Sequence, residues 1–185
     1  MELKGLRVKG VLMDEKAIDT AIDRMAEEIE SRHSESCGLL LIGIKTRGVP
    51  IADRIAEKIS KSRGMSVTVG TFDISFYRDD LSLIWEKPVV KGHDFPDDIT
   101  GKKLIIVDDV LYTGRTIIAA IDEILDMGRP AKVELAVLVD RGHREFPLCP
   151  DYCGLKVETT KREIIKVQLK EVDGRDEVLI LEREG

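Results

Sequence analysis

The residues best suited to chemistry lie in the segment 104–116, LIIVDDVLYTGRT, where an apolar run ends in two adjacent carboxylates. Asp108 and Asp109 can accept hydrogen bonds from the neighbouring hydroxyl groups of a sugar. Residues 113–116 then lead into an amphipathic pattern, and the free N–H groups at the start of a helix bind phosphate. Gly114 allows the backbone to approach a ligand closely, and two threonine hydroxyls add donors. A ribose 5-phosphate would satisfy both halves of this segment.

The same segment fits other interpretations. An ordinary strand-to-helix turn capped by Thr116 would leave it without a ligand. A phosphate-accepting receiver domain also carries acids at strand ends, but it does not need a phosphate-binding turn after them, so we rank it lower. The sequence has no G-x-x-x-x-G-K-[ST] motif, and no G-x-G-x-x-G follows a strand, so neither common nucleotide motif is present.

Two further strand patterns end in charged residues. Residues 45–48, KTRG, place two cations and a glycine after an apolar run, which suits an anion, although a basic surface turn would look the same. Residues 140–144, DRGHR, follow the predicted strand 132–139. His143 there could act as a general base, but we favour an exposed polar residue near the site. Ligands of parallel sheets bind beyond the carboxyl ends of the strands, so these three segments define the expected site.

The elements that must position these segments follow from periodicity. Apolar residues at three- and four-residue spacing predict helices, and short continuous apolar runs predict strands buried on both faces. Alternation of the two predicts an α/β fold with a mostly parallel sheet covered on both faces. The predicted helices are 14–32, 50–62 and 116–127, and the predicted strands are 38–44, 66–74, 103–107 and 132–139, with shorter strands around 164–169 and 178–181 separated by the turn-like Asp173-Gly174.

Composition bounds the class of protein. With 185 residues and 43% hydrophobic residues, one globular domain over 1–185 is expected. The net charge of −6 argues against nonspecific coating of nucleic acid. No apolar run approaches the roughly 20 residues of a membrane span, and no signal-peptide pattern is present. Three cysteines, Cys37, Cys149 and Cys153, are too few for a disulfide framework, so a cytoplasmic location is expected; a metal site or redox pair is less favoured than incidental thiols.

Residues 75–100 interrupt the alternation. They contain Pro88, Gly92, Pro96 and many charges, with no sustained period. A segment of this length without regular structure is usually a functional loop or a hairpin that extends from the fold.

The segment 104–116 resembles the phosphoribosyl pyrophosphate (PRPP) motif of type I phosphoribosyltransferases. Together with residues 43–48, 73–81 and 139–145, it looks like the family of bacterial pyrimidine-operon attenuation regulators that are also uracil phosphoribosyltransferases. The resemblance covers about 14–178. It implies the type I phosphoribosyltransferase fold, with a lid loop at about 75–100 and a small hood formed by about 150–185 and the N-terminal segment.

The resemblance also implies an activity, the formation of UMP and diphosphate from uracil and PRPP. The implied catalytic residues are Asp108, Asp109 and Arg78, with Arg78 on the lid. Mg²⁺ would bridge PRPP, with Asp108 and Asp109 as candidate ligands, and no organic cofactor is implied. A non-proline cis peptide is common in the loop that corresponds to 45–48. The implied PRPP- and phosphate-binding residues are Thr46, Arg47, Asp108, Asp109, Val110, Leu111, Tyr112, Thr113, Gly114, Arg115 and Thr116, and the implied base-binding residues are Asp140, Arg141 and Ile165.

The same family implies regulation by UMP-responsive binding to the leader mRNA of pyrimidine genes, which promotes transcription attenuation. Candidate RNA-binding residues are Arg144, Lys156 and Lys161. Acids on the first predicted helix, including Asp19 and Asp23, depart from the basic surface expected there. The alternative is a salvage phosphoribosyltransferase for another nucleobase with no RNA-binding role. The implied partners are uracil, PRPP, UMP and a second copy of the chain, in a homodimer or higher homo-oligomer, and no membrane.

Overall fold

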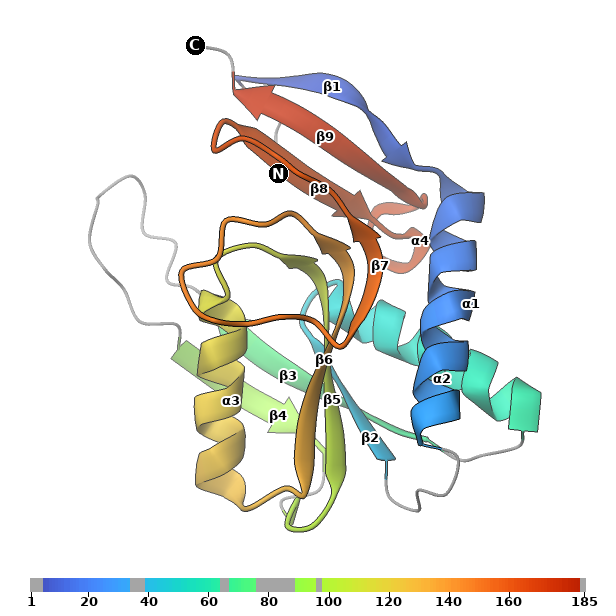
Figure 1. The fold of residues 1–185 in the computed structure, drawn as a ribbon, viewed down its shortest axis with the longest axis vertical. Helices are drawn as coiled ribbons and strands as arrows, with labels where there is room; N and C mark the ends of the chain where they lie inside the picture. Colours follow the sequence, from blue (N-terminus) through green and yellow to red (C-terminus); the bar gives the residue numbers. More distant parts are fainter. Residues whose placement is uncertain (1–4, 34–38, 64–66, 76–88, 96–97, 184–185) are drawn as a thin grey trace.

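The computed structural model describes residues 5–33, 39–63, 67–75, 89–95 and 98–183 (Figure 1). Its elements alternate as the sequence predicts over most of the chain. In order they are β1 Leu6–Met13, α1 Glu15–Arg32, β2 Leu39–Ile44, α2 Gly48–Arg63, β3 Thr68–Ser75, β4 Val89–Asp94, β5 Lys103–Leu111, α3 Arg115–Met127, β6 Lys132–Asp140, β7 Tyr152–Lys156, β8 Glu163–Gln168, α4 Lys170–Asp173 and β9 Glu177–Arg183.

The large sheet has the strand order β4-β3-β2-β5-β6-β7. Only β4 runs antiparallel to its neighbour; the other pairs are parallel. Helices α1 and α2 lie on one side of the sheet and α3 on the other (Figure 1). Alternate residues of β5 follow this division, since Ile105 and Val107 pack with α1 and α2 while Leu104 and Ile106 pack with α3. Burial on both faces explains why the central strands read as continuous apolar runs.

A second, three-stranded antiparallel sheet, which we call the hood sheet, has the order β1-β9-β8 (Figure 1). Strand β1 was not predicted, although its alternating apolar and charged residues fit a strand with one solvated face. Residues 152–156, which we had grouped with the hood, instead form β7 at the edge of the large sheet. The hood sheet therefore joins the N-terminal strand to residues 163–183.

Three predicted boundaries change in ways that matter for the site. Strand β5 continues past Val107 to Leu111, so both carboxylates belong to the strand rather than to the turn after it. Helix α2 begins at Gly48, the last residue of the basic segment 45–48. Part of 75–100 is a strand, β4, paired with β3. Arg78 lies outside the described residues, and so does most of the predicted lid.

Helix α1 begins where the sequence predicts, because the Asp14 side chain accepts a hydrogen bond from the backbone N–H of Ala17 at 2.8 Å. Its acids are partly neutralised within the chain, since Lys58 of α2 pairs with both Asp19 and Asp23. No helix in the described part of the chain is both long and apolar enough to span a membrane.

Candidate functional site

The three charged segments meet at one edge of the large sheet. Strands β2 and β5 pair in parallel, with Gly43 beside Val107, and β5 and β6 pair with Leu111 beside Asp140. The carboxyl ends of the three strands therefore place 45–48, 108–116 and 140–144 together, as the sequence predicts.

Asp108 and Asp109 form a buried acidic pair. Asp108 is 9% exposed and Asp109 is half-buried. The Asp108 carboxylate accepts the backbone N–H of Asp109 at 2.9 Å, and the Asp109 carboxylate accepts that of Val110 at 3.0 Å. Among the described residues, no Lys or Arg forms an ion pair with either carboxylate.

Burial raises the pKa of Asp108, and the charge of Asp109 raises it further. Burial also raises the pKa of Asp109, although the hydrogen bond with Asp108 and the charge of Arg47 oppose that rise. Two carboxylates with so few cationic partners are suited to binding hydroxyl groups or a cation supplied with a ligand.

A cavity of about 260 Å³ joins the acidic pair to the basic segment, with Lys45, Thr46 and Arg47 on one side and both aspartates on the other. Gly48 permits this approach, since a Cβ there would lie 2.3 Å from the carbonyl oxygen of Val107. The peptide bond between Lys45 and Thr46 is cis, as the resemblance implied.

A second cavity, of about 320 Å³, lies over the start of α3 and is lined by residues 110–117 together with Asp108. Gly114 precedes the helix with a φ of 91°, and a Cβ there would lie 2.8 Å from Leu148 Cδ1. The Thr113 hydroxyl accepts the backbone N–H of Arg115 at 3.4 Å, and the next N–H groups of the helix, those of Thr116 and Ile117, are available to an anion. The Arg115 guanidinium pairs with Glu145, and Leu111 is fully buried, so the groups that this turn leaves open to the cavity are mainly backbone groups.

The Arg47 side chain is held by the hood. Its Nε and Nη2 donate to the two carboxylate oxygens of Asp173 at 3.0 and 2.7 Å. This pairing raises the pKa of Arg47 and lowers that of Asp173. Asp173 is predicted from the sequence only as a turn residue, because its partner lies 126 positions away in the chain.

The third segment also connects the site to the hood. Arg141 is 6% exposed; its guanidinium donates to the carbonyl oxygens of Glu163 and Thr160 at 2.7 and 3.1 Å. The same group lies 4.1 Å from the centre of the Tyr112 ring, and burial lowers its pKa. Asp140 accepts the backbone N–H of Gly142 and pairs with Arg144 at 2.5 Å. The side chains of Asp140 and Arg141 therefore already have hydrogen-bonding partners within the protein.

Two further expectations change here. Arg144 donates to the carbonyl oxygens of Tyr112, Gly142 and Leu111, so its guanidinium stabilises the loop after β5 and is not a free cation for RNA. His143 is half-buried rather than exposed, and its Nε2 lies 2.5 Å from the carbonyl oxygen of Thr159. Ile165 lies in β8, is 8% exposed and belongs to the core that α1 and α2 cover.

Comparisons with known proteins agree with this geometry. Residues 11–171 match the model of the phosphoribosyl transferase domain. The chain belongs to the phosphoribosyltransferase family. It is 52% identical to the "Bifunctional protein PyrR" of Thermoanaerobacter sp. (strain X514), over 96% of this chain and 100% of that protein, and 52% identical to that of Bacillus subtilis (strain 168), over 95% and 98%. The relative of the same name from Clostridioides difficile (strain 630) is 53% identical over 94% of this chain and 98% of that protein.

Solved structures confirm the phosphoribosyltransferase fold. A hypoxanthine-guanine phosphoribosyltransferase from Bacillus anthracis superposes with a TM-score of 0.74 at 20% identity, covering 95% of this chain and 99% of that chain. The hypoxanthine phosphoribosyltransferase of Trypanosoma cruzi gives 0.75 at 17% identity, covering 96% and 98%. At these identities the likeness concerns the fold and not the base that is used.

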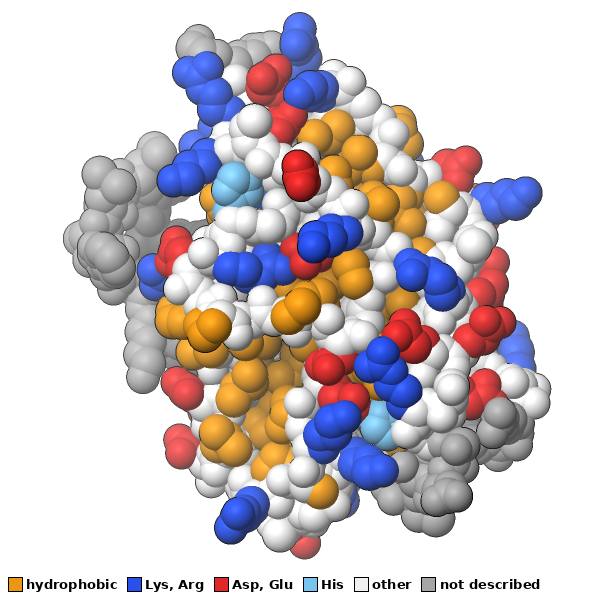
Figure 2. Space-filling view, in the orientation of Figure 1, with side chains coloured by type: hydrophobic (Ala, Val, Ile, Leu, Met, Phe, Trp, Pro, Cys, Tyr) orange, Lys and Arg blue, Asp and Glu red, His pale blue; other side chains and the backbone are white. Residues whose placement is uncertain are grey.

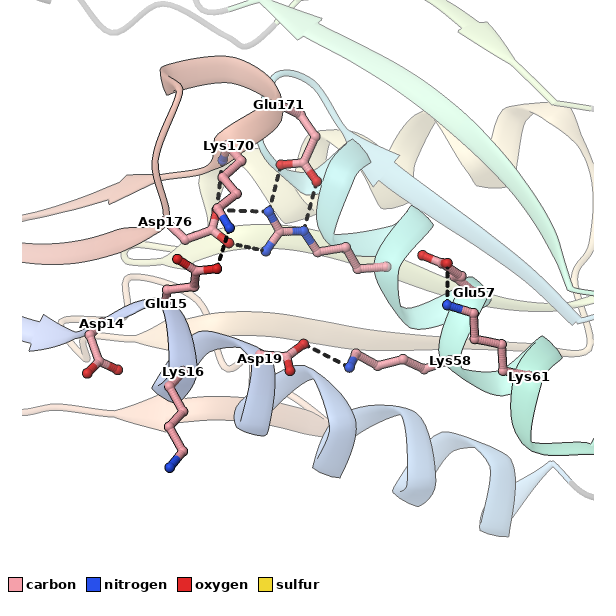
Figure 3. A pocket seen from close by; sticks show the side chains of 11 residues that line it. Asp14, Glu15, Lys16, Asp19, Glu57, Lys58, Lys61, Lys170, Glu171 and Asp176 are labelled. Carbon is pink, nitrogen blue, oxygen red and sulfur yellow. Dashed lines mark hydrogen bonds and ion pairs between the residues drawn. The ribbon is translucent and has the colours of Figure 1, made fainter.

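The two cavities beside Asp108 are smaller than another hollow in the described part of the chain. A groove of about 1060 Å³ lies between α1, α2 and α4 and is lined almost wholly by charged side chains (Figure 3). Arg54 donates to both oxygens of Glu171 at 2.8 and 2.7 Å and pairs with Asp176, and Lys170 pairs with Glu15. Its charges neutralise one another, so this groove attaches the hood to the helices and offers little to a ligand.

Proposed function

We propose that the chain is a uracil phosphoribosyltransferase, which converts uracil and PRPP to UMP and diphosphate. In this reaction the C1–O bond to diphosphate breaks, N1 of uracil bonds to C1 of the ribose, and the N1 proton is lost. The site must hold the base close, bind the leaving diphosphate and exclude water, because an open site would hydrolyse PRPP.

One observation carries this proposal: a buried, partner-poor acidic pair lies between two cavities that suit different phosphate groups. The turn before α3 offers N–H donors to the 5-phosphate of ribose. Asp108 and Asp109 would accept the ribose hydroxyls, and the 45–47 loop would bind the diphosphate through its backbone and Arg47. A single PRPP molecule would use all three groups at once.

The residues present fit Mg²⁺ that arrives with PRPP. Carboxylate oxygens are the ligands that Mg²⁺ prefers, and it commonly uses one or two of them with substrate phosphates and waters. Asp108 and Asp109 supply two such groups at the cavity. A bound cation would stabilise their charged forms and the charge on the leaving diphosphate. In the described part of the chain, no cluster of three or more metal-ligating side chains would hold the ion alone.

The base would lie beside residues 140–144, next to side chains that other parts of the protein hold in position. We propose that Asp140 and Arg141 shape this part of the site from behind, with the Tyr112 ring on the guanidinium face and Ile165 supporting the hood. Arg78 remains the proposed lid residue for the diphosphate.

A labelled-uracil assay with PRPP and Mg²⁺ tests this function. We expect UMP formation by the wild type and a fall on the order of 1000-fold in the variant carrying Asp108→Asn and Asp109→Asn. Competition by hypoxanthine and guanine separates uracil use from the salvage of another nucleobase. Unchanged turnover of the double variant would overturn the assignment of the acidic pair, and preference for a purine would overturn the assignment of the base.

We also propose a second function, UMP-responsive binding of pyrimidine leader mRNA that promotes transcription attenuation. Lys156, Lys161 and Arg162 are exposed, and none forms an ion pair with a described residue. Lys156 ends β7 beside Asp140 of β6, so this basic group adjoins the nucleotide site. On the face in Figure 2, basic and acidic side chains are interspersed, which favours a local site over a broad basic surface.

Filter binding to the leader RNA, with and without UMP, tests this second function. UMP promotes binding only if it binds the RNA-competent state more tightly. We expect UMP to raise RNA affinity, and Lys156→Ala with Lys161→Ala to lower it. Absence of UMP-dependent binding at low salt would leave only the enzyme.

We propose that the chain acts as a homodimer or a higher homo-oligomer. Hydrophobic side chains gather over α3 in Figure 2, where Leu125 is 57% exposed. Light scattering of the wild type and of Leu125→Glu tests this assembly, and a wild-type monomer would contradict it.

A further inference from the structure

Arg47 and Asp173 form a rigid pair. The two parallel hydrogen bonds, Nε to Oδ2 at 3.0 Å and Nη2 to Oδ1 at 2.7 Å, define the plane of the guanidinium as well as its position. Asp173 is itself fixed, because its Oδ2 also accepts the backbone N–H of Leu169 at 3.0 Å. Its side chain is only 15% exposed, so solvent competes weakly with Arg47 for this carboxylate.

The pair connects two parts of the molecule that the sequence keeps far apart. Arg47 follows β2 and lines the cavity that contains Asp108 and Asp109, whereas Asp173 belongs to α4, between two strands of the hood sheet. The two bonds use one edge of the guanidinium. No described residue accepts a hydrogen bond from Nη1, so the other edge has donors left for an anion.

We propose that Asp173 is the positioning residue for Arg47: it holds the guanidinium at the edge of the cavity, ready for the diphosphate of PRPP. This inference rests on the proposed function. It makes diphosphate affinity depend on a side chain of the hood that touches no substrate.

Asp173 could instead compete with diphosphate for Arg47, and the surroundings of Arg47 argue against that. The charge of Asp109 also acts on Arg47, so a guanidinium released from Asp173 would be drawn toward the acidic pair. Arginine has high side-chain entropy when unrestrained. Loss of Asp173 would thus both disorder Arg47 and favour a position where it opposes ribose and cation binding.

The chain contains a matched control for this idea. Glu171 lies on the same short helix and forms the same two-bond pair with an arginine of α2, Arg54, at 2.8 and 2.7 Å (Figure 3). Arg54 faces the charged groove and not the cavity beside Asp108. Glu171→Gln therefore removes a similar hood contact without affecting the diphosphate loop.

The experiment measures kcat, KM for PRPP and KM for uracil, with PRPP binding by calorimetry and thermal unfolding as a check on folding. We expect Asp173→Asn to raise KM for PRPP about tenfold, the lower end of what loss of an orienting partner costs, with little change in KM for uracil. Asp173→Glu should restore most of the affinity. Glu171→Gln should leave KM for PRPP unchanged even if it lowers the unfolding temperature.

Two results would overturn the inference: an unchanged or lower KM for PRPP in Asp173→Asn, or an equal rise in Glu171→Gln. A double-mutant cycle sharpens the test, since Asp173→Asn should have no further effect on PRPP binding in an Arg47→Ala background. If the wild type does not bind PRPP, the proposed function itself fails, which this design distinguishes from failure of the positioning role.

Discussion

The large sheet buries a carboxylate near each of its ends, Asp108 beside the half-buried Asp109 where β5 finishes and Glu134 near the start of β6. Glu134 is 2% exposed, yet it is fully paired: it accepts hydrogen bonds from Lys132 at 2.7 Å and from the Tyr152 hydroxyl at 3.2 Å, and lies 2.6 Å from His33 Nε2. Burial alone would raise the pKa of Glu134, but the hydrogen bond from Lys132 and the charges of His33 and Lys132 lower it overall.

The carboxylates at the two ends of the sheet therefore differ in role, since Glu134 forms ion pairs within the protein whereas, among the described residues, Asp108 and Asp109 form none. A buried carboxylate with its partners in place is part of the structure, whereas a buried pair without them depends on a ligand to supply them. The contrast teaches that burial of an acid does not mark a site; the shortage of partners does.

The largest effect should come from Asp108→Asn combined with Asp109→Asn. We expect UMP formation to fall on the order of 1000-fold, as when preorganised electrostatic groups are removed, without loss of thermal stability. Stability is retained or raised because two charges that are costly to bury are replaced by neutral amides. Steady-state rates and unfolding midpoints measured on the same sample check both parts, and a large loss of stability would contradict the contrast.

Glu134→Gln should give the reverse pattern. We expect stability to fall by about 2 kcal/mol, since Lys132, His33 and Tyr152 lose a charged partner in a buried setting. For a chain of this length that corresponds to a fall of about 4–8 °C in the unfolding midpoint. KM for PRPP should not change. Lost PRPP affinity would show that this end of the sheet also serves the site.

Alanine substitution at two glycines with positive φ can distinguish an effect on backbone strain from an effect on PRPP binding. Gly114 has a φ of 91° in the turn before α3, and Gly101 has a φ of 73° before β5, with open space where a Cβ would lie. Substitution by alanine should cost about 1 kcal/mol of stability at either position. Only Gly114→Ala should also raise KM for PRPP, because its Cβ would press on Leu148 and shift the turn. Equal KM values would count against phosphate binding there.

The smallest expected effect is on the pH dependence of stability. The contribution of Asp108, at the end of β5, should change with pH in the opposite direction to that of Glu134, near the start of β6. The pKa of Asp108 is raised from 3.8 in the folded protein, so the wild type should lose stability relative to Asp108→Asn as pH rises from that value through the folded pKa. The pKa of Glu134 is lowered from 4.5, so its contribution is present above that pH and is lost as pH falls through the folded pKa. Urea titrations of the wild type and both variants from about pH 2 to about pH 8 compare the two slopes, because the Glu134 contribution is lost only below pH 4.5. Slopes of the same sign would contradict the assignment.

Much of the site could be predicted because its signals are local. The apolar run before Asp108, the turn at 113–116 and the basic segment at 45–48 each show their chemistry within a few residues. The rule that parallel strands present their carboxyl ends together then placed them at one edge, where the structure has them. Strand β1 was missed because Arg7 and Lys9 interrupt its apolar residues, and β7 because it is short and lies at the edge of the sheet.

The sequence by itself determined the alternation of helices and strands, the family and the three segments of the site, since periodicity and motif are properties of neighbouring residues. Only the tertiary structure decided which charged side chains bind to other groups within the protein. Asp173 joins Arg47, Arg144 closes the loop at Tyr112, and Arg141 reaches the hood backbone. Such pairings depend on burial and on contacts between distant segments, and these exist only once the sheets and helices have packed.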